Sequence, residues 1–451
     1  MIEALRNAWR LPDVRNKLLI TGLILVIYQF VAHVPVVGVD TDALERLLDP
    51  NTTGSGLIDV LNLLSGGAVA NFSILANGVY PYITASIIFQ LLIPIVPQLQ
   101  AMQREPGGQE KIQRYTYYVT IPMAAIQAFG QIQIFNTLLA TNPGDAATAT
   151  STMQIIPGFG TDFLLTISVL ATMTAGTMFA VWLGELITEQ GIGNGISVII
   201  FAGIVARAPF NFGNLVSQSL RPVVDVVMFL VIVLFSVAVM IAIQEGVRRI
   251  PVQYGKRVRG RKQYGGASSH IPIRVNPVGM IPLIFSQAVI TFPAVIVAFF
   301  PDGPVKTDIT NTFGSQEGGV YWISFFLLTV AFTFFYSEVM IGNQNLAETL
   351  QRNGGFIPGI RPGKRTQDYI VNVTRRITLV GAIFLGVVAV VPGLVDAFNG
   401  VLFPGESVTT GVNAATVLPG ASLIIVVGVV IDFMRQLEAQ LVMRNYEGFM
   451  R

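Results

Sequence analysis

The chain alternates long apolar stretches with short polar segments. A helix needs about 20 mostly apolar residues to cross a bilayer. The first stretch lacks a small-residue cleavage site, so it is predicted to be a span and not a removed signal peptide. The expected fold is an all-α polytopic membrane protein with ten transmembrane helices. The predicted spans are residues 18–37, 74–97, 115–137, 162–183, 193–210, 222–244, 275–300, 320–341, 374–395 and 414–434.

One further apolar piece is too short to be a span. Residues 57–70, LIDVLNLLSGGAVA, carry Asp59 and are interrupted by Gly66 and Gly67. Stretches of 10 to 14 apolar residues are typical of re-entrant or interfacial segments. Non-helical backbone at membrane depth is tolerated where protein buries it or where it lines a cavity. This piece is therefore predicted to be a short re-entrant helix that covers a pore.

Ten spans divide naturally into two halves of five, residues 1–210 and 211–451. Many membrane transport proteins are built from two inverted repeats, with the transported species passing between them. This organisation predicts two pseudo-symmetric halves. No repeat of individual residues is visible between them, so ten spans without internal symmetry remain the alternative.

Composition agrees with a multi-pass membrane protein. Hydrophobic residues make up 52% of the 451 positions and charged residues 12%, whereas a soluble domain carries roughly 25% charged residues. Lys and Arg avoid the spans and gather in alternate loops, as the positive-inside rule requires. Both termini and the loops 245–274 and 342–373 are thus predicted to be cytoplasmic. Of the 28 basic residues, the exceptions are Arg46, Arg207, Arg221 and Lys306.

The predicted spans contain few ionisable side chains and no catalytic motif. Asp432 and Glu338 lie near predicted cytoplasmic ends, and neither His33 nor His270 belongs to a ligand pattern. A secondary transporter, the main alternative, usually keeps ionisable groups within the membrane. An intramembrane enzyme, a more distant alternative, would need a polar catalytic cluster there. Neither such ionisable groups nor a polar catalytic cluster is visible within the spans. The chain has no cysteine, and no cofactor or metal is predicted.

Nucleotide binding is also not predicted. The segment GIRPGKRT, residues 359–366, resembles a phosphate-binding loop only superficially. It has three residues between its glycines where the motif needs four. Arg365 also follows the lysine where Ser or Thr should bind magnesium. A chain that moves a substrate would therefore need a driving partner outside itself.

The second and seventh spans differ from the others in their prolines and polar residues. A proline inside a helix removes a hydrogen bond and bends the axis, so kinks are predicted at Pro81, Pro94 and Pro97, and at Pro277, Pro282 and Pro293. Hydrogen bonding between helices is the ordinary role of such polar side chains, and it is weak. Weak polar contacts between two helices would also allow those helices to separate. The polar residues are Thr84, Ser86 and Gln90, and Asn276, Ser286 and Gln287.

Six stretches together resemble the bacterial SecY family of protein-conducting channels, over essentially the whole chain. They occur in the family's order and on the sides that the charge pattern requires. They are LSGGAVANFSILANGVYPYITASIIFQLL (64–92), GELITEQGIGNGISVIIFAGIVA (184–206), RRIPVQYGKR (248–257), NPVGMIPLIF (276–285), GGFIPGIRPGKRT (354–366) and QLEAQLVMRNYEGF (436–449).

The resemblance implies a channel that moves unfolded polypeptides across the membrane and releases apolar segments sideways into lipid. It implies that 57–70 is a plug, with Asp59, Leu61, Leu64, Gly66 and Gly67 within it. An aliphatic pore ring is implied at the constriction: Val79, Ile83, Ile196, Ile200, Ile284 and Ile425. A lateral gate is implied between the second and seventh spans, with Thr84, Gln90, Gln287 and Phe292.

The cytoplasmic loops offer a cationic surface suited to ribosomal RNA phosphates or to acidic protein patches. The resemblance implies that these loops dock the SecA ATPase and the ribosome. It also implies SecE and SecG as small membrane partners, signal peptides and nascent chains as substrates, and the bacterial plasma (inner) membrane as the location. The predicted docking residues are Arg248, Arg249, Lys256, Arg257, Arg361 and Lys364.

Overall fold

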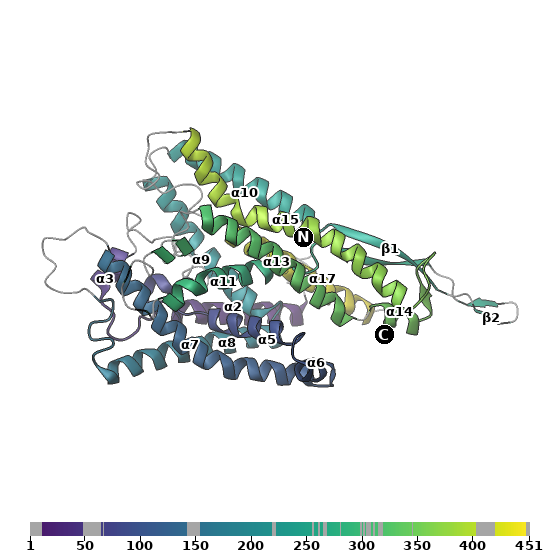
Figure 1. The fold of residues 1–451 in the computed structure, drawn as a ribbon, viewed down its shortest axis with the longest axis horizontal. Coiled ribbons are helices and arrows are strands. Elements are labelled where there is room, and N and C mark those ends of the chain that lie inside the picture. Colours follow the sequence, from purple (N-terminus) through teal and green to yellow (C-terminus); the bar gives the residue numbers. More distant parts are fainter. Residues whose placement is uncertain are drawn as a thin grey trace.

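The computed structural model describes residues 11–47, 65, 67–141, 154–218, 222–254, 257–259, 262–264, 268–279, 281–297, 300, 303, 308–309, 312–313, 319–344, 346–402 and 420–447. These residues form a helical bundle with a small sheet at one end (Figure 1). The longer helices are α2 (Pro12–Val31), α5 (Tyr80–Leu92), α7 (Gly108–Thr141), α8 (Phe163–Gln190), α9 (Gly195–Gln218), α10 (Pro222–Gln244), α11 (Ile281–Val297), α13 (Gly319–Gln344), α15 (Lys364–Leu402) and α17 (Gly420–Glu447).

Each of the ten predicted spans overlaps one of these helices, with different bounds in most cases. Several helices extend beyond the apolar stretch, because backbone hydrogen bonding continues into polar turns; α7 has 34 residues and α15 has 39. In the part of the chain that the structure describes, five helices are long and apolar enough to cross a membrane. A bent pair of helices would make a sixth. The protein is a multi-pass membrane protein of the all-α class.

The prolines do less bending than expected. Pro81 lies in the first turn of α5, where a proline nitrogen has no helical partner to lose. Similarly, α11 begins at Ile281, so that Pro277 precedes the helix and Pro282 lies in its first turn. The predicted kinks at these three positions are wrong. The second stretch does break at residues 93–96, where α5 meets α6 (Pro97–Arg104) at 105°.

The two basic loops contain strands. In the first loop, β1 (Val247–Tyr254) pairs antiparallel with β4 (Ser268–Arg274), and β2 (Arg257–Arg259) pairs with β3 (Lys262–Tyr264). In the second, β5 (Gly355–Phe356) adds to β1, after the short helix α14 (Leu346–Arg352). Successive residues of a strand face opposite sides, so Ile250 and Val252 face the same side. They are buried in one apolar cluster with Ile273 of β4 and with Leu350, Ile357 and Ile370 of the second loop.

The bundle has two ends with different elements (Figure 1). The sheet, α14 and α6 lie at one end, and α3 (Thr41–Leu47) lies at the other. Contacts link α2, α5, α7, α8 and α9 into one group, and α10, α11, α13, α15 and α17 into a second. The groups meet where α11 packs on α5 and α7, and where α9 packs on α10 and α17.

Candidate pore, gate and docking surface

The six predicted pore-ring residues come from four helices and lie in one continuous apolar core. Val79 precedes α5, and Ile83 lies one turn into it. The pair Ile196 and Ile200 lies on α9, spaced so that both face the same side. Five of the six are buried, and Ile196 is half-buried against the same core; Ile284 is on α11 and Ile425 on α17. Their arrangement as a ring remains a prediction.

The helices predicted to form the lateral gate, α5 and α11, are in contact. Tyr80, in the first turn of α5, lies with its hydroxyl oxygen 2.8 Å from the carbonyl oxygen of Ala288 and 2.8 Å from Oγ1 of Thr291. Both acceptors are on α11. Tyr80 is not among the gate residues predicted from the sequence. A tyrosine within an otherwise apolar stretch could have indicated a polar contact between helices, because its hydroxyl needs a partner when buried.

The four selected gate residues have other partners. Thr84 donates to carbonyls within α5, and its Oγ1 accepts from Nε2 of Gln127 on α7 at 3.2 Å. Gln287 donates to the hydroxyl of Tyr321 on α13 at 3.1 Å. These polar contacts of Thr84 and Gln287 lead away from the α5–α11 contact.

The remaining two gate residues are less enclosed. Gln90 donates to Ser86 within α5 at 3.0 Å, and its buried Oε1 has no hydrogen-bond partner among the residues that the structure describes. Phe292 is 42% exposed. The hydroxyl of Tyr80 thus joins the two predicted gate helices by hydrogen bonding. The role of the other four residues in a gate stays a prediction.

Four predicted plug residues, Asp59, Leu61, Leu64 and Gly66, lie outside the described residues. The fifth, Gly67, has φ +95°, and its carbonyl oxygen accepts a hydrogen bond from Nη2 of Arg207 on α9 at 2.8 Å. Tyr28 of α2 donates to the carbonyl oxygen of Ser65 at 2.6 Å. Two helices, α2 and α9, therefore hold the C-terminal part of the predicted plug segment.

The predicted docking residues divide between the two loops that the sheet unites. Arg248 and Arg249 are exposed on β1. Arg361 is exposed between Gly359 (φ +83°) and Gly363 (φ +105°), and Lys364 is exposed at the start of α15. Arg257 contributes its backbone to β2, and Lys256 lies outside the described residues. Because β5 pairs with β1, both loops belong to one structural unit.

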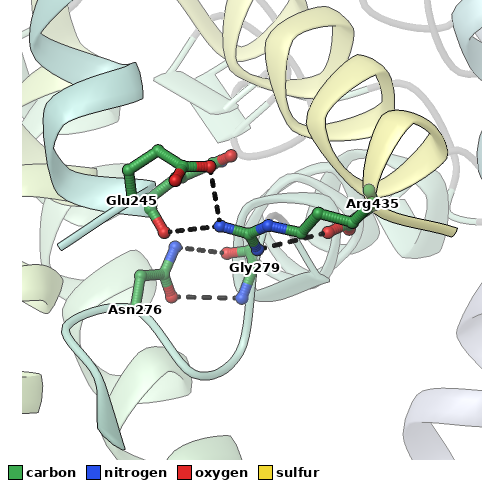
Figure 2. Close-up of polar contacts among 6 residues, drawn as sticks. Glu245, Asn276, Gly279 and Arg435 are labelled. Atoms are coloured by element: carbon green, nitrogen blue, oxygen red, sulfur yellow. Dashed lines mark hydrogen bonds and ion pairs between the residues drawn. The ribbon is translucent and has the colours of Figure 1, made fainter. Parts of the chain in front are cut away.

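The base of this sheet is held by a cluster that we name the sheet root: Gln244, Glu245, Asn276, Gly279 and Arg435 (Figure 2). Nη2 of Arg435, on α17, donates to the carbonyl oxygen of Gln244 at 3.0 Å and contacts Oε1 of Glu245 at 3.1 Å. Gln244 ends α10, where carbonyls lack helical partners, so the guanidinium caps that terminus.

On the other side of the sheet root, Asn276 folds the chain between β4 and α11. Its side chain exchanges two hydrogen bonds with the backbone of Gly279, at 3.0 and 3.1 Å. Sequence reasoning missed this cluster, since nothing local links residues nearly 200 positions apart. Across the described residues, no group of three or more His, Asp or Glu side chains is placed to bind a metal ion.

The chain is similar to known proteins over its whole length. The profile of the SecY family matches residues 73–434. The chain is 40% identical to "Protein translocase subunit SecY" of Bacillus licheniformis and 36% identical to that of Thermotoga maritima. Each alignment covers all of this chain, with 100% and 98% of the relative.

Two solved structures share the fold. One is described as "The structure of a protein conducting channel", with a TM-score of 0.62 and 16% identity. The other is described as "Sec61 in the Canine ribosome-channel complex from the endoplasmic reticulum", with a TM-score of 0.61 and 16% identity. In both cases 97% of each chain is covered.

Proposed function

Because this chain belongs to the SecY family, whose members are protein-conducting channel subunits and not enzymes, we propose that it moves unfolded, signal-bearing polypeptides across a membrane and releases apolar segments sideways into lipid. A multi-pass secondary transporter is not favoured, because the relatives of this chain are protein translocase subunits.

The observation that carries this proposal is the convergence of six aliphatic residues, from four helices, in one apolar core. Aliphatic side chains can close a pore by excluding water. They also form no directional bonds that a passing polypeptide would have to break. A constriction of this kind can therefore yield to substrates of varied sequence.

Sideways release requires two groups of helices that can separate. The packing of the helices into two groups supports the two halves that we propose, residues 1–210 and 211–451. Leu, Ile, Phe and Val each favour insertion into the membrane by about 0.3–0.6 kcal/mol at a helix centre. A segment of twenty such residues gains several kcal/mol by moving from the pore into lipid, so the channel need only open between α5 and α11.

The driving force must come from a docked partner. The proposed partners are the SecA ATPase and the ribosome, which would bind the cationic sheet formed by both basic loops. SecE and SecG are the proposed membrane partners. The sheet, α14 and α6 lie at the same end of the bundle (Figure 1), which supports placing them together on the cytoplasmic side of a bacterial inner membrane.

Reconstitution tests the proposed function. The chain is placed in lipid vesicles with a SecE-type subunit, and SecA, ATP and a signal-bearing precursor are added. The precursor should become protected from protease only when ATP and this chain are both present. Failure to protect any precursor, with SecA bound and hydrolysing ATP, would reject the proposal.

A further inference from the structure

Tyr80 occupies an unusual position among the polar residues of α5 and α11. Its side chain is 5% exposed, and its hydroxyl reaches two atoms of α11, the carbonyl oxygen of Ala288 and Oγ1 of Thr291. It follows Val79 directly and precedes Ile83 by less than one turn. The contact between the helices thus adjoins the predicted constriction.

A count of protons shows which helix the hydroxyl of Tyr80 must bond to. The tyrosine hydroxyl has one proton, and both acceptors within reach belong to α11. Whichever of them receives the proton, a hydrogen bond runs from α5 to α11. If Ala288 receives it, the hydroxyl of Thr291 can donate to Tyr80 in return.

The other buried hydroxyls of these helices are bonded locally. Ser286 donates to Pro282 within α11, and Thr84 donates to carbonyls within α5. Bonds of that kind survive when two helices move apart, since both partners move together. The Tyr80 bond must break. A buried hydroxyl that loses its partner is penalised until water reaches it, so this bond opposes small separations most strongly.

We infer that Tyr80 is a latch between α5 and α11 that sets how apolar a segment must be before it can part the two helices and enter lipid. The inference rests on the sideways release proposed above. Tyr80 acts here as a positioning residue, which determines specificity by stabilising the closed state. Removing one neutral hydrogen bond should shift the closed-to-open equilibrium by about two- to tenfold.

Spin labelling measures this equilibrium directly. The chain has no cysteine, so Ile88→Cys on α5 and Ile296→Cys on α11, both exposed, would provide the only two labelling sites. In lipid vesicles, pulsed electron paramagnetic resonance should show a larger long-distance population in Tyr80→Phe. Thr291→Val should move the population in the same direction. Its effect should be smaller or absent in the Tyr80→Phe background, because the two residues share one network.

Ser337→Ala is the matched control. It also removes a buried hydroxyl that bonds to another helix, at 2.9 Å, but its partner Thr378 belongs to α15 and not to α11. The distance distribution between the labels should remain that of the parent chain. If Ser337→Ala shifts it as much as Tyr80→Phe does, the effect is general loosening and the latch is rejected.

A functional readout uses model segments with a graded number of leucines. Tyr80→Phe should lower the number needed for half-maximal insertion by about two, since each leucine supplies a fraction of one hydrogen bond. An unchanged threshold together with an unchanged distance distribution would overturn the inference. If Tyr80→Phe does not fold, the same two measurements on Tyr80→Met, which also lacks the hydroxyl, decide the matter.

The two proposals fail in different ways. If the parent chain inserts none of the model segments, sideways release is wrong, whatever Tyr80 does. If the parent inserts them and Tyr80→Phe behaves like the parent in both measurements, only the latch is wrong.

Discussion

The sheet root and the α5–α11 contact both join segments that are far apart in the chain, but their chemistry differs. At the sheet root, a half-buried guanidinium binds a helix-terminal carbonyl and a carboxylate, and β1 and β4 pair along seven residues. Between α5 and α11, the hydroxyl of Tyr80 and apolar side chains make the contact.

The two joins should therefore respond differently to force. Hydrogen bonds to charged groups contribute about 1.5–3 kcal/mol and neutral ones about 0.5–1.5 kcal/mol. The lower figure is comparable to the insertion energy of two or three leucines. The contacts that hold the docking sheet must stay intact while a docked partner exerts force on it. A gate must instead open at a free-energy cost that insertion of the substrate segment can offset.

The largest expected effect concerns what the held sheet binds. Reversing Arg248, Arg249 and Arg361 to Glu should weaken ribosome binding by at least about 100-fold, because cationic contacts to phosphates are lost. The salt dependence of log affinity should also flatten by about three. Binding to ribosomes and to SecA would be measured over a salt series.

Matched charge reversals control for net charge. Arg15, Arg114 and Arg376 are exposed positions outside the sheet, and changing them to Glu alters the charge equally. Affinity close to that of the parent is expected. Equal losses in both triple variants would assign binding to overall charge and not to the sheet.

The next effect tests whether apolar contact closes the pore. Replacing Ile83 and Ile425 by Asn should hydrate the constriction, and single-channel conductance of the resting protein should rise roughly tenfold. Planar bilayers would measure it. Ile24→Asn, at a buried position of the same core on α2, is the control and should not conduct. Background conductance in the double variant would refute the ring.

A smaller effect is expected at the sheet root. Arg435→Gln should destabilise the join by about 1–2 kcal/mol, at the lower end for a charged donor because its side chain is 27% exposed. Hydrogen exchange should accelerate in residues 247–254 and 268–274. Arg375→Gln breaks an exposed pair with Glu338 at 3.0 Å and should cost less than about 0.5 kcal/mol. Equal costs would remove the contrast between the joins.

An effect of similar size concerns a third join, between Arg207 and Gly67, which also has a guanidinium donor. Gly67→Ala should cost about 1–2 kcal/mol, because φ is +95°. An added Cβ would also lie 3.0 Å from Nε of Arg207. Gly107→Ala carries similar strain, at φ +76°, with open space around its Cβ. Thermal unfolding should show a larger loss for Gly67→Ala, and equal losses would mean that Arg207 adapts freely.

Much of this molecule follows from its sequence. The positions of ten helices, the class of fold and the two basic loops could be predicted because membrane insertion depends on local apolar length and on nearby charge. The residues of the predicted pore ring were named from the resemblance to the SecY family, and the i,i+4 spacing of Val79 with Ile83 and of Ile196 with Ile200 agrees with it. Which faces meet is a different question.

Only the tertiary structure decides the partners. The hydroxyl of Tyr80 meets residues 208 and 211 positions away, and Arg435 meets Gln244 191 positions away, through packing that no local pattern encodes. The same holds for β5, two residues long, which becomes a strand because β1 offers it hydrogen bonds. Apolar length determines where the chain crosses the membrane, but the geometry of packed helices determines which polar group is left to join one helix to another.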